Sequence, residues 1–183
     1  MNRRFMKLTL VALLAAPIVG FYAGCDRDSS TSSTTSASAD PLPANLVLSE
    51  APANPRNVAD VVKDAKDGDE VVVAGKVGGR REPFVAGRAL MTVVDVNQQS
   101  CKEIEGDNCP TPWDYCCVPQ DALAPNLATV QFVGADGKPL KADLTSVSGL
   151  KPLSEVVVKG NVQRGADGKS VIINATGLYV KKS

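Results

Sequence analysis

Four cysteines lie within seventeen residues of this chain, at Cys101, Cys109, Cys116 and Cys117. Three of them fall in the segment DNCPTPWDYCC (107–117), which also holds the only tryptophan, Trp113. Thiols at this density can form disulfides, bind a soft metal or exchange electrons with other thiols. The compartment and the elements that hold the segment decide among these three.

The N-terminal segment indicates the compartment. Three basic residues precede an apolar run from Leu8 to Val19, which is too short to span a bilayer comfortably and is typical of a secretory signal peptide. The run ends in YAGC (22–25), which resembles the lipobox of bacterial lipoproteins. This resemblance implies cleavage before Cys25, a diacylglycerol on its thiol, and a membrane-anchored protein of the cell envelope that faces the periplasm or the cell exterior. The alternatives are an ordinary signal peptide with a chance cysteine and an uncleaved anchor helix.

The segment after Cys25 is rich in Ser, Thr and Ala and has almost no large apolar residue before Leu42. Such a composition cannot build a core. We therefore predict a signal peptide over residues 1–24, a disordered tether over 25–50 and one folded domain over 51–183, which is an ordinary domain size.

Charge and composition exclude several functions. The leader removes three of the twenty basic residues and none of the twenty acids, so the net charge of the remainder is about −3. A general attraction to nucleic acid is therefore not expected. The chain has no histidine, which excludes His-based catalytic triads, His-ligated haem and the usual catalytic zinc sites.

Five stretches within the domain predict β-strands. Each is rich in Val, Ile or other strand-forming residues and is bounded by turn residues. They are residues 69–78, 88–96, 127–133, 155–164 and 170–180. One helix is expected before them, because Val58, Val61, Val62 and Ala65 recur at helical spacing and Gly68 ends the pattern.

Two of these strands contain a near-repeat, EVVVAGKV (70–77) and EVVVKGNV (155–162), with a glycine inside each. A glycine in a strand marks a bulge or a sharp bend, as in a small barrel. Here the chain resembles an OB-fold of the nucleic-acid-binding, tRNA-anticodon type. The resemblance implies an all-β, five-stranded barrel with one N-terminal helix, and the long connection between the second and third predicted strands adds an insertion to it. The rival architecture is an open five-stranded sandwich.

That insertion, residues 97–126, contains all four clustered cysteines, and we call it the cysteine lobe. In an oxidising compartment disulfides are expected there. A disulfide between the neighbours Cys116 and Cys117 would close a small, strained ring. Two pairings remain: Cys101 with Cys116 and Cys109 with Cys117, or the crossed pairing of Cys101 with Cys117 and Cys109 with Cys116. The spacing lacks the C-x2-C pairs of zinc ribbons, but a metal site for copper(I) or an iron–sulfur cluster on the four thiols remains an alternative, as does a reactive vicinal dithiol.

Function is predicted only as a class. No nucleophile, base and orienting group stand together, so we expect a non-catalytic binding or assembly module without a cofactor other than the lipid. Trp113 and Tyr115 are either a small core of the lobe or its candidate binding tip. Because every strand can be assigned without the lobe, we expect it to be detachable. An unknown protein, small molecule or oligosaccharide is the expected ligand. Binding of nucleic acid or oligosaccharide on the OB face is a lesser alternative, because the domain has few aromatic residues and its one dense basic cluster is Arg80, Arg81 and Arg88.

Overall fold

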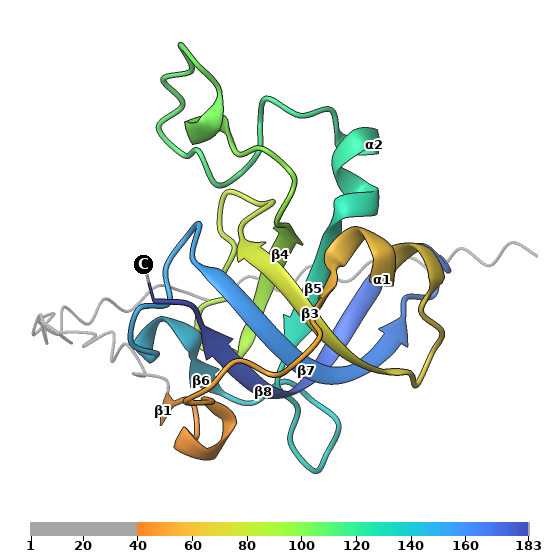
Figure 1. Cartoon of the computed structure of the whole chain (residues 1–183). Helices are drawn as coiled ribbons and strands as arrows, with labels where there is room; N and C mark the ends of the chain where they lie inside the picture. The colour runs from red at the N-terminus through yellow and green to blue at the C-terminus, as the bar shows by residue number, and fades with distance from the viewer. Residues whose placement is uncertain (1–39, 183) are drawn as a thin grey trace, which may run out of the picture. The chain divides into compact units, whose positions relative to one another are not determined.

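The computed structural model describes residues 40–182 (Figure 1). The predicted signal peptide, Cys25 and most of the predicted tether lie outside these residues. Within them, no helix is both long enough and apolar enough to cross a membrane.

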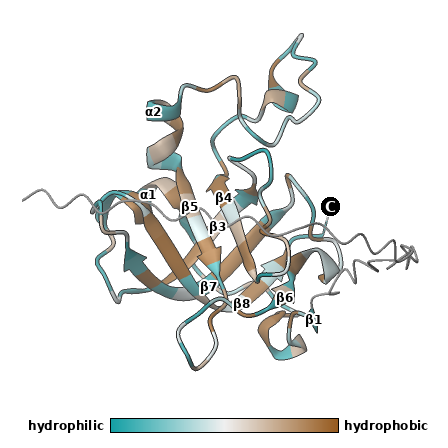
Figure 2. Cartoon of the chain, turned by 180° about the vertical axis from the view of Figure 1, so that it is seen from behind, coloured by the Kyte–Doolittle hydropathy of each residue, from teal (hydrophilic) through white to brown (hydrophobic). Residues whose placement is uncertain are grey.

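Five long strands form the body of the domain, and each falls within its predicted stretch. They are β3 (Glu70–Val77), β4 (Leu90–Asp95), β5 (Leu127–Gln131), β7 (Glu155–Arg164) and β8 (Val171–Val180). Along β7 buried and more exposed residues alternate, as expected for a strand with one face on a core. Apolar residues follow the strands, and the turns between them are largely hydrophilic (Figure 2).

The strands close into a barrel. Their order is β3-β4-β5-β8-β7, and β7 pairs back onto β3. All neighbours are antiparallel except β5 and β8, which are parallel. In order of sequence this is 1-2-3-5-4-1, the topology of an OB-fold. The predicted fold class is confirmed, and the open sandwich is wrong because β3 and β7 share seven residue pairs, from Glu70 with Asn161 to Lys76 with Glu155.

Both strand glycines stand where the barrel needs them. Gly75 pairs with Asp95 of β4 and with Val156 of β7, at the point where β3 passes from one neighbour to the other. At Gly160 the register between β7 and β8 shifts, and a Cβ there would lie 2.9 Å from the Cα of Ala175. The prediction of bends at these positions is confirmed for the second glycine by the bulge itself.

Helix α1 (Val58–Asp64) covers part of the barrel with its valines, since Val58 and Val61 are fully buried. Its N-terminus is held by Asp95, whose Oδ2 accepts a hydrogen bond of 2.8 Å from Ala59 N. A carboxylate at this position satisfies a free backbone N–H and complements the helix dipole. At the other end Arg164 donates to the carbonyl oxygens of Val62 and Ala65, both at 2.9 Å.

The folded part begins before the predicted boundary at residue 51. Strand β1 (Asp40–Pro41) pairs with β6 (Ala142–Asp143), and the 3-10 helix η1 (Ala44–Leu46) follows it. Leu42 is buried in the main core, and Leu48 N donates to Leu178 O at 2.7 Å. The prediction of a disordered tether up to residue 50 is therefore wrong for residues 40–50. A short strand, β2 (Arg56–Asn57), then pairs with β3.

The cysteine lobe stands at one end of the barrel, between β4 and β5 (Figure 1). It contains the 3-10 helix η2 (Cys101–Glu103), the short helix α2 (Gln120–Leu123) and the 3-10 helix η3 (Ala124–Asn126). A fourth 3-10 helix, η4 (Leu144–Ser146), lies in the connection between β5 and β7.

Candidate binding site at the cysteine lobe

One disulfide closes the loop 101–117 within the lobe. Cys101, fully buried in η2, is bonded to Cys117, and their Cα atoms are 6.2 Å apart. This bond belongs to the crossed pairing, in which Cys109 would join Cys116. It links two points sixteen residues apart, which reduces the conformational entropy of the unfolded chain.

The other two cysteines lie side by side as thiols. The Sγ atoms of Cys109 and Cys116 are 3.2 Å apart, and that of Cys116 is 3.9 Å from the Sγ of Cys101. The hydrogen bond with Cys109, together with Asp114, raises the pKa of the Cys116 thiol to about 12. A thiol is a nucleophile only as thiolate, so this exposed cysteine is poorly suited to redox catalysis at neutral pH.

The donor atoms fit a metal only in part. Sulfur atoms of Cys101, Cys109 and Cys116 and a carboxylate oxygen of Asp114 lie within 4.8 Å of one another. The sulfur of Cys101 is already bonded to Cys117, so two thiols and one carboxylate remain. Structural zinc sites take four protein ligands. Within residues 40–182, the sulfur atoms of all four cysteines do not come together in one group that could hold a metal ion.

Tyr115 is a core residue. Its side chain is fully buried in a second hydrophobic cluster with Val94 and Leu123, against which Leu127 also packs. Its backbone is left-handed, with φ of 58°, and its hydroxyl is buried without a hydrogen-bond partner. Burial raises the pKa of this phenol. The prediction that Tyr115 belongs to a binding tip is therefore wrong, because its side chain offers no surface to a ligand.

Several contacts dock the lobe on the barrel. Lys76 of β3 is 8% exposed, and its Nζ lies 3.1 Å from the carboxylate of Glu103 in η2. Hydrogen bonds from Ser100 N and Oγ lower the pKa of that carboxyl group. Gly79 N donates to Trp113 O at 2.8 Å. The lobe therefore does not merely hang from the barrel, because its side chains complete a core and an ion pair with barrel strands, and its detachment stays a prediction.

Sequence reasoning missed Asp95, Lys76 and Glu103. Asp95 is 2% exposed and accepts hydrogen bonds from Ala59 N and Asn97 N, so one carboxylate fixes both the helix start and the first turn of the lobe. The pattern Ser100-x-x-Glu103 is a readable capping box, formed here on η2. Nothing in the sequence connects Glu103 with the lysine of β3.

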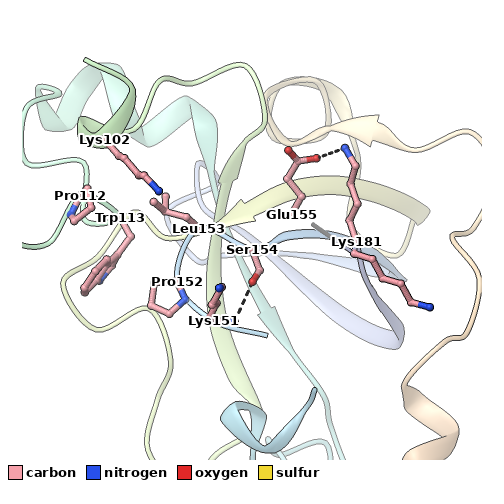
Figure 3. A pocket seen from close by; sticks show the side chains of 10 residues that line it. Lys102, Pro112, Trp113, Lys151, Pro152, Leu153, Ser154, Glu155 and Lys181 are labelled. Carbon is pink, nitrogen blue, oxygen red and sulfur yellow. Dashed lines mark hydrogen bonds and ion pairs between the residues drawn. The ribbon is translucent and has the colours of Figure 1, made fainter. Parts of the chain in front are cut away.

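Trp113 stands at the edge of a groove between the lobe and the barrel. Its indole Nε1 donates to Arg81 O at 3.0 Å, and the residue is partly buried. The groove encloses about 760 Å³ and is lined by residues from three distant segments of the chain (Figure 3). They are Lys102, Pro112, Trp113, Lys151, Pro152, Leu153, Ser154, Glu155, Lys181 and Lys182.

A second hollow of about 850 Å³ lies between α1, α2 and the turn from β7 to β8. Its charged residues are of both signs, and two of them have structural partners. Arg164 holds the end of α1, and Asp167 accepts three hydrogen bonds within its own turn, from Lys169 N and from the N and Oγ of Ser170. The hydrogen bond from Ser170 N and those beside it lower the pKa of Asp167 to about 2. This hollow is therefore the weaker candidate.

Comparisons with protein-family models and with curated proteins return no match for this chain. Function is therefore inferred from the geometry of the lobe and of the groove beside it.

Proposed function

We propose that this protein is a non-catalytic, envelope-anchored lipoprotein whose barrel and cysteine lobe form a binding module. The groove at Trp113 is the observation that supports this proposal most strongly. A partly buried tryptophan, fixed by a hydrogen bond on its Nε1, offers a rigid aromatic surface at low entropic cost. The prolines beside it, Pro112 and Pro152, stiffen the walls.

The lobe serves in this proposal as the support of the site. The Cys101–Cys117 disulfide fixes the lobe internally, and the Lys76–Glu103 ion pair holds it against the barrel. Sites on supported elements keep their geometry better than sites on free loops. The second pair, Cys109 with Cys116, encloses Trp113 in a ring of eight residues when it is oxidised.

Fluorescence of Trp113 tests the binding function, because the chain has no other tryptophan. The full chain in detergent is titrated with fractionated envelope glycans and peptides. We expect one class to shift the emission saturably. The absence of any shift with every fraction would contradict the proposed site.

A fatty-acid label tests the anchor. Because Cys25 is the only thiol at the end of the leader's apolar run, Cys25→Ser should abolish incorporation of the label and leave uncleaved or soluble protein. Lipid labelling of this variant at the parent level would remove the anchor from the proposal.

A metal-binding or thiol-redox protein is the second candidate, favoured by the proximity of Cys109, Asp114 and Cys116. Alkylation under non-reducing conditions, followed by mass spectrometry and metal analysis, separates the two. Protein from its own compartment without free thiols and without metal supports the binding module. Two free thiols with a bound soft metal support the second candidate.

A further inference from the structure

We infer that the groove at Trp113 binds an acidic polysaccharide, with one sugar ring against the indole and the carboxylates of a uronic acid chain on the lysines. This inference rests on the proposed binding function and names the ligand class of the same site. The groove receives no residue from the middle strands β4 and β5, so it is a different surface from the OB face.

The apolar part of the groove fits the face of a sugar ring. Trp113, Pro112, Pro152 and Leu153 line it, and Figure 3 shows the indole beside Pro152. The Nε1–H of Trp113 is already donated to Arg81 O, so the indole offers its face and not its donor. A pyranose ring has C–H groups on its faces and polar groups around its edge, and it can stack on such a surface while its edge stays in water.

The charged part of the groove fits an anion. Lys102 comes from the lobe and Lys151 from the segment before β7, and neither forms an ion pair with any residue of 40–182. Glu155 is the only acid of the lining, and its carboxylate is bound at 2.7 Å by Lys181. The groove therefore carries an excess of positive charge in a protein whose processed form is acidic overall. Such a local excess attracts a polyanion with spaced charges.

The backbone beside the groove argues against an extended peptide as the ligand. Peptides that bind as an added strand need free backbone N–H and C=O groups. Here Leu153 N donates to Val77 O at 2.8 Å and Ser154 N donates to Lys151 O at 3.0 Å. Lys151 N is taken by Ser154 Oγ at 3.1 Å, and Pro152 has no N–H. A ligand in this groove is thus recognised by stacking on the apolar residues and by its charge.

Isothermal titration of the full chain with three polymers of similar length tests the inference. The probes are oligogalacturonate, neutral dextran and poly-glutamate. Trp113→Ala should lower the affinity for oligogalacturonate about thirtyfold, the scale of an interface hot spot. Lys102→Gln with Lys151→Gln should lower it about three- to tenfold, with a weaker salt dependence. Lys63→Gln with Lys169→Gln removes the same charge at the second hollow and should leave the affinity unchanged.

Each outcome of these titrations either supports or overturns the inference. Binding of oligogalacturonate that requires both Trp113 and the lysines supports the inference. Equal binding of poly-glutamate, equal binding of dextran, or an effect of the control pair as large as that of the groove lysines would overturn it. A different ligand that shifts the Trp113 emission, with no heat from oligogalacturonate, refutes the polysaccharide and leaves the binding function in place. No heat from any polymer together with no emission shift from any fraction refutes both.

Discussion

Replacing residues 97–126 by a short Gly/Ser turn should leave a folded but clearly weakened barrel. The deletion removes Tyr115 and Leu123, which are 0% and 1% exposed. Losing a buried leucine and a buried aromatic side chain costs about 4–6 kcal/mol by burial alone. The disulfide already shortens this connection to about fifteen residues in the unfolded chain, so a turn of about four residues returns only about 1 kcal/mol. The expected net loss is about 3–5 kcal/mol.

For a domain of this size that loss lowers the thermal midpoint by about 10–15 °C. Circular dichroism should still show a β-sheet spectrum at 20 °C, and thermal and urea melts give the midpoint and the free energy of unfolding. Tyr115→Ala in the intact chain is the matched variant, because it removes the buried ring without changing loop length, and it should account for most of the loss. A deletion protein that melts within about 2 °C of the parent would refute the second core as a stabilising element.

Three further changes test single features of the structure. Gly160→Val should lower the free energy of unfolding by about 3 kcal/mol in urea melts, because the new Cβ would collide with the backbone of Asn174. The control, Lys159→Val one residue earlier, should change it by less than about 1 kcal/mol. Tyr115→Phe should leave the thermal midpoint unchanged or raise it, because it removes a buried hydroxyl that has no hydrogen-bond partner. A fall of several degrees would contradict this and would mean that the hydroxyl does have a partner. The lowered pKa of Glu103 means that its contribution to stability is complete above its ordinary pKa of 4.5 and is lost as the pH falls through the lowered folded value. Urea midpoints between pH 5 and 2 should therefore fall less in Glu103→Gln than in the parent, and parallel curves would contradict this.

The barrel could be predicted from the sequence because its signals are local and repeated. Runs of Val and Ile between turn residues located all five strands, and the glycines in the near-repeat indicated closure. Each of these signals is a property of about ten consecutive residues, and each agrees with the fold as a whole. Topology then followed from the resemblance to the OB-fold.

The binding site could not be predicted in the same way, because it is made by residues far apart in the chain. The sequence indicates Trp113 as a candidate because it is a large aromatic residue in the cysteine lobe, but Lys151 and Leu153 join it only through the path of the connection before β7. Whether Tyr115 points into the domain or outward depends on a left-handed backbone in a loop, which no periodicity reveals. The packing of residues 40–50 was also missed, because it depends on a few leucines in a polar segment, such as Leu42.

The Cys101–Cys117 disulfide has a mechanical consequence for a protein loaded through its ligand. A pull on Trp113 reaches the barrel at the facing ends of β4 and β5, which are antiparallel neighbours. Tension applied there to an open connection would unzip the two strands one hydrogen bond at a time, the direction in which a hairpin is weakest. Cys101 and Cys117 hold the two sides of the connection 6.2 Å apart at their Cα atoms. A load on Trp113 is therefore divided between both sides of the connection at this bond before it reaches the two strands.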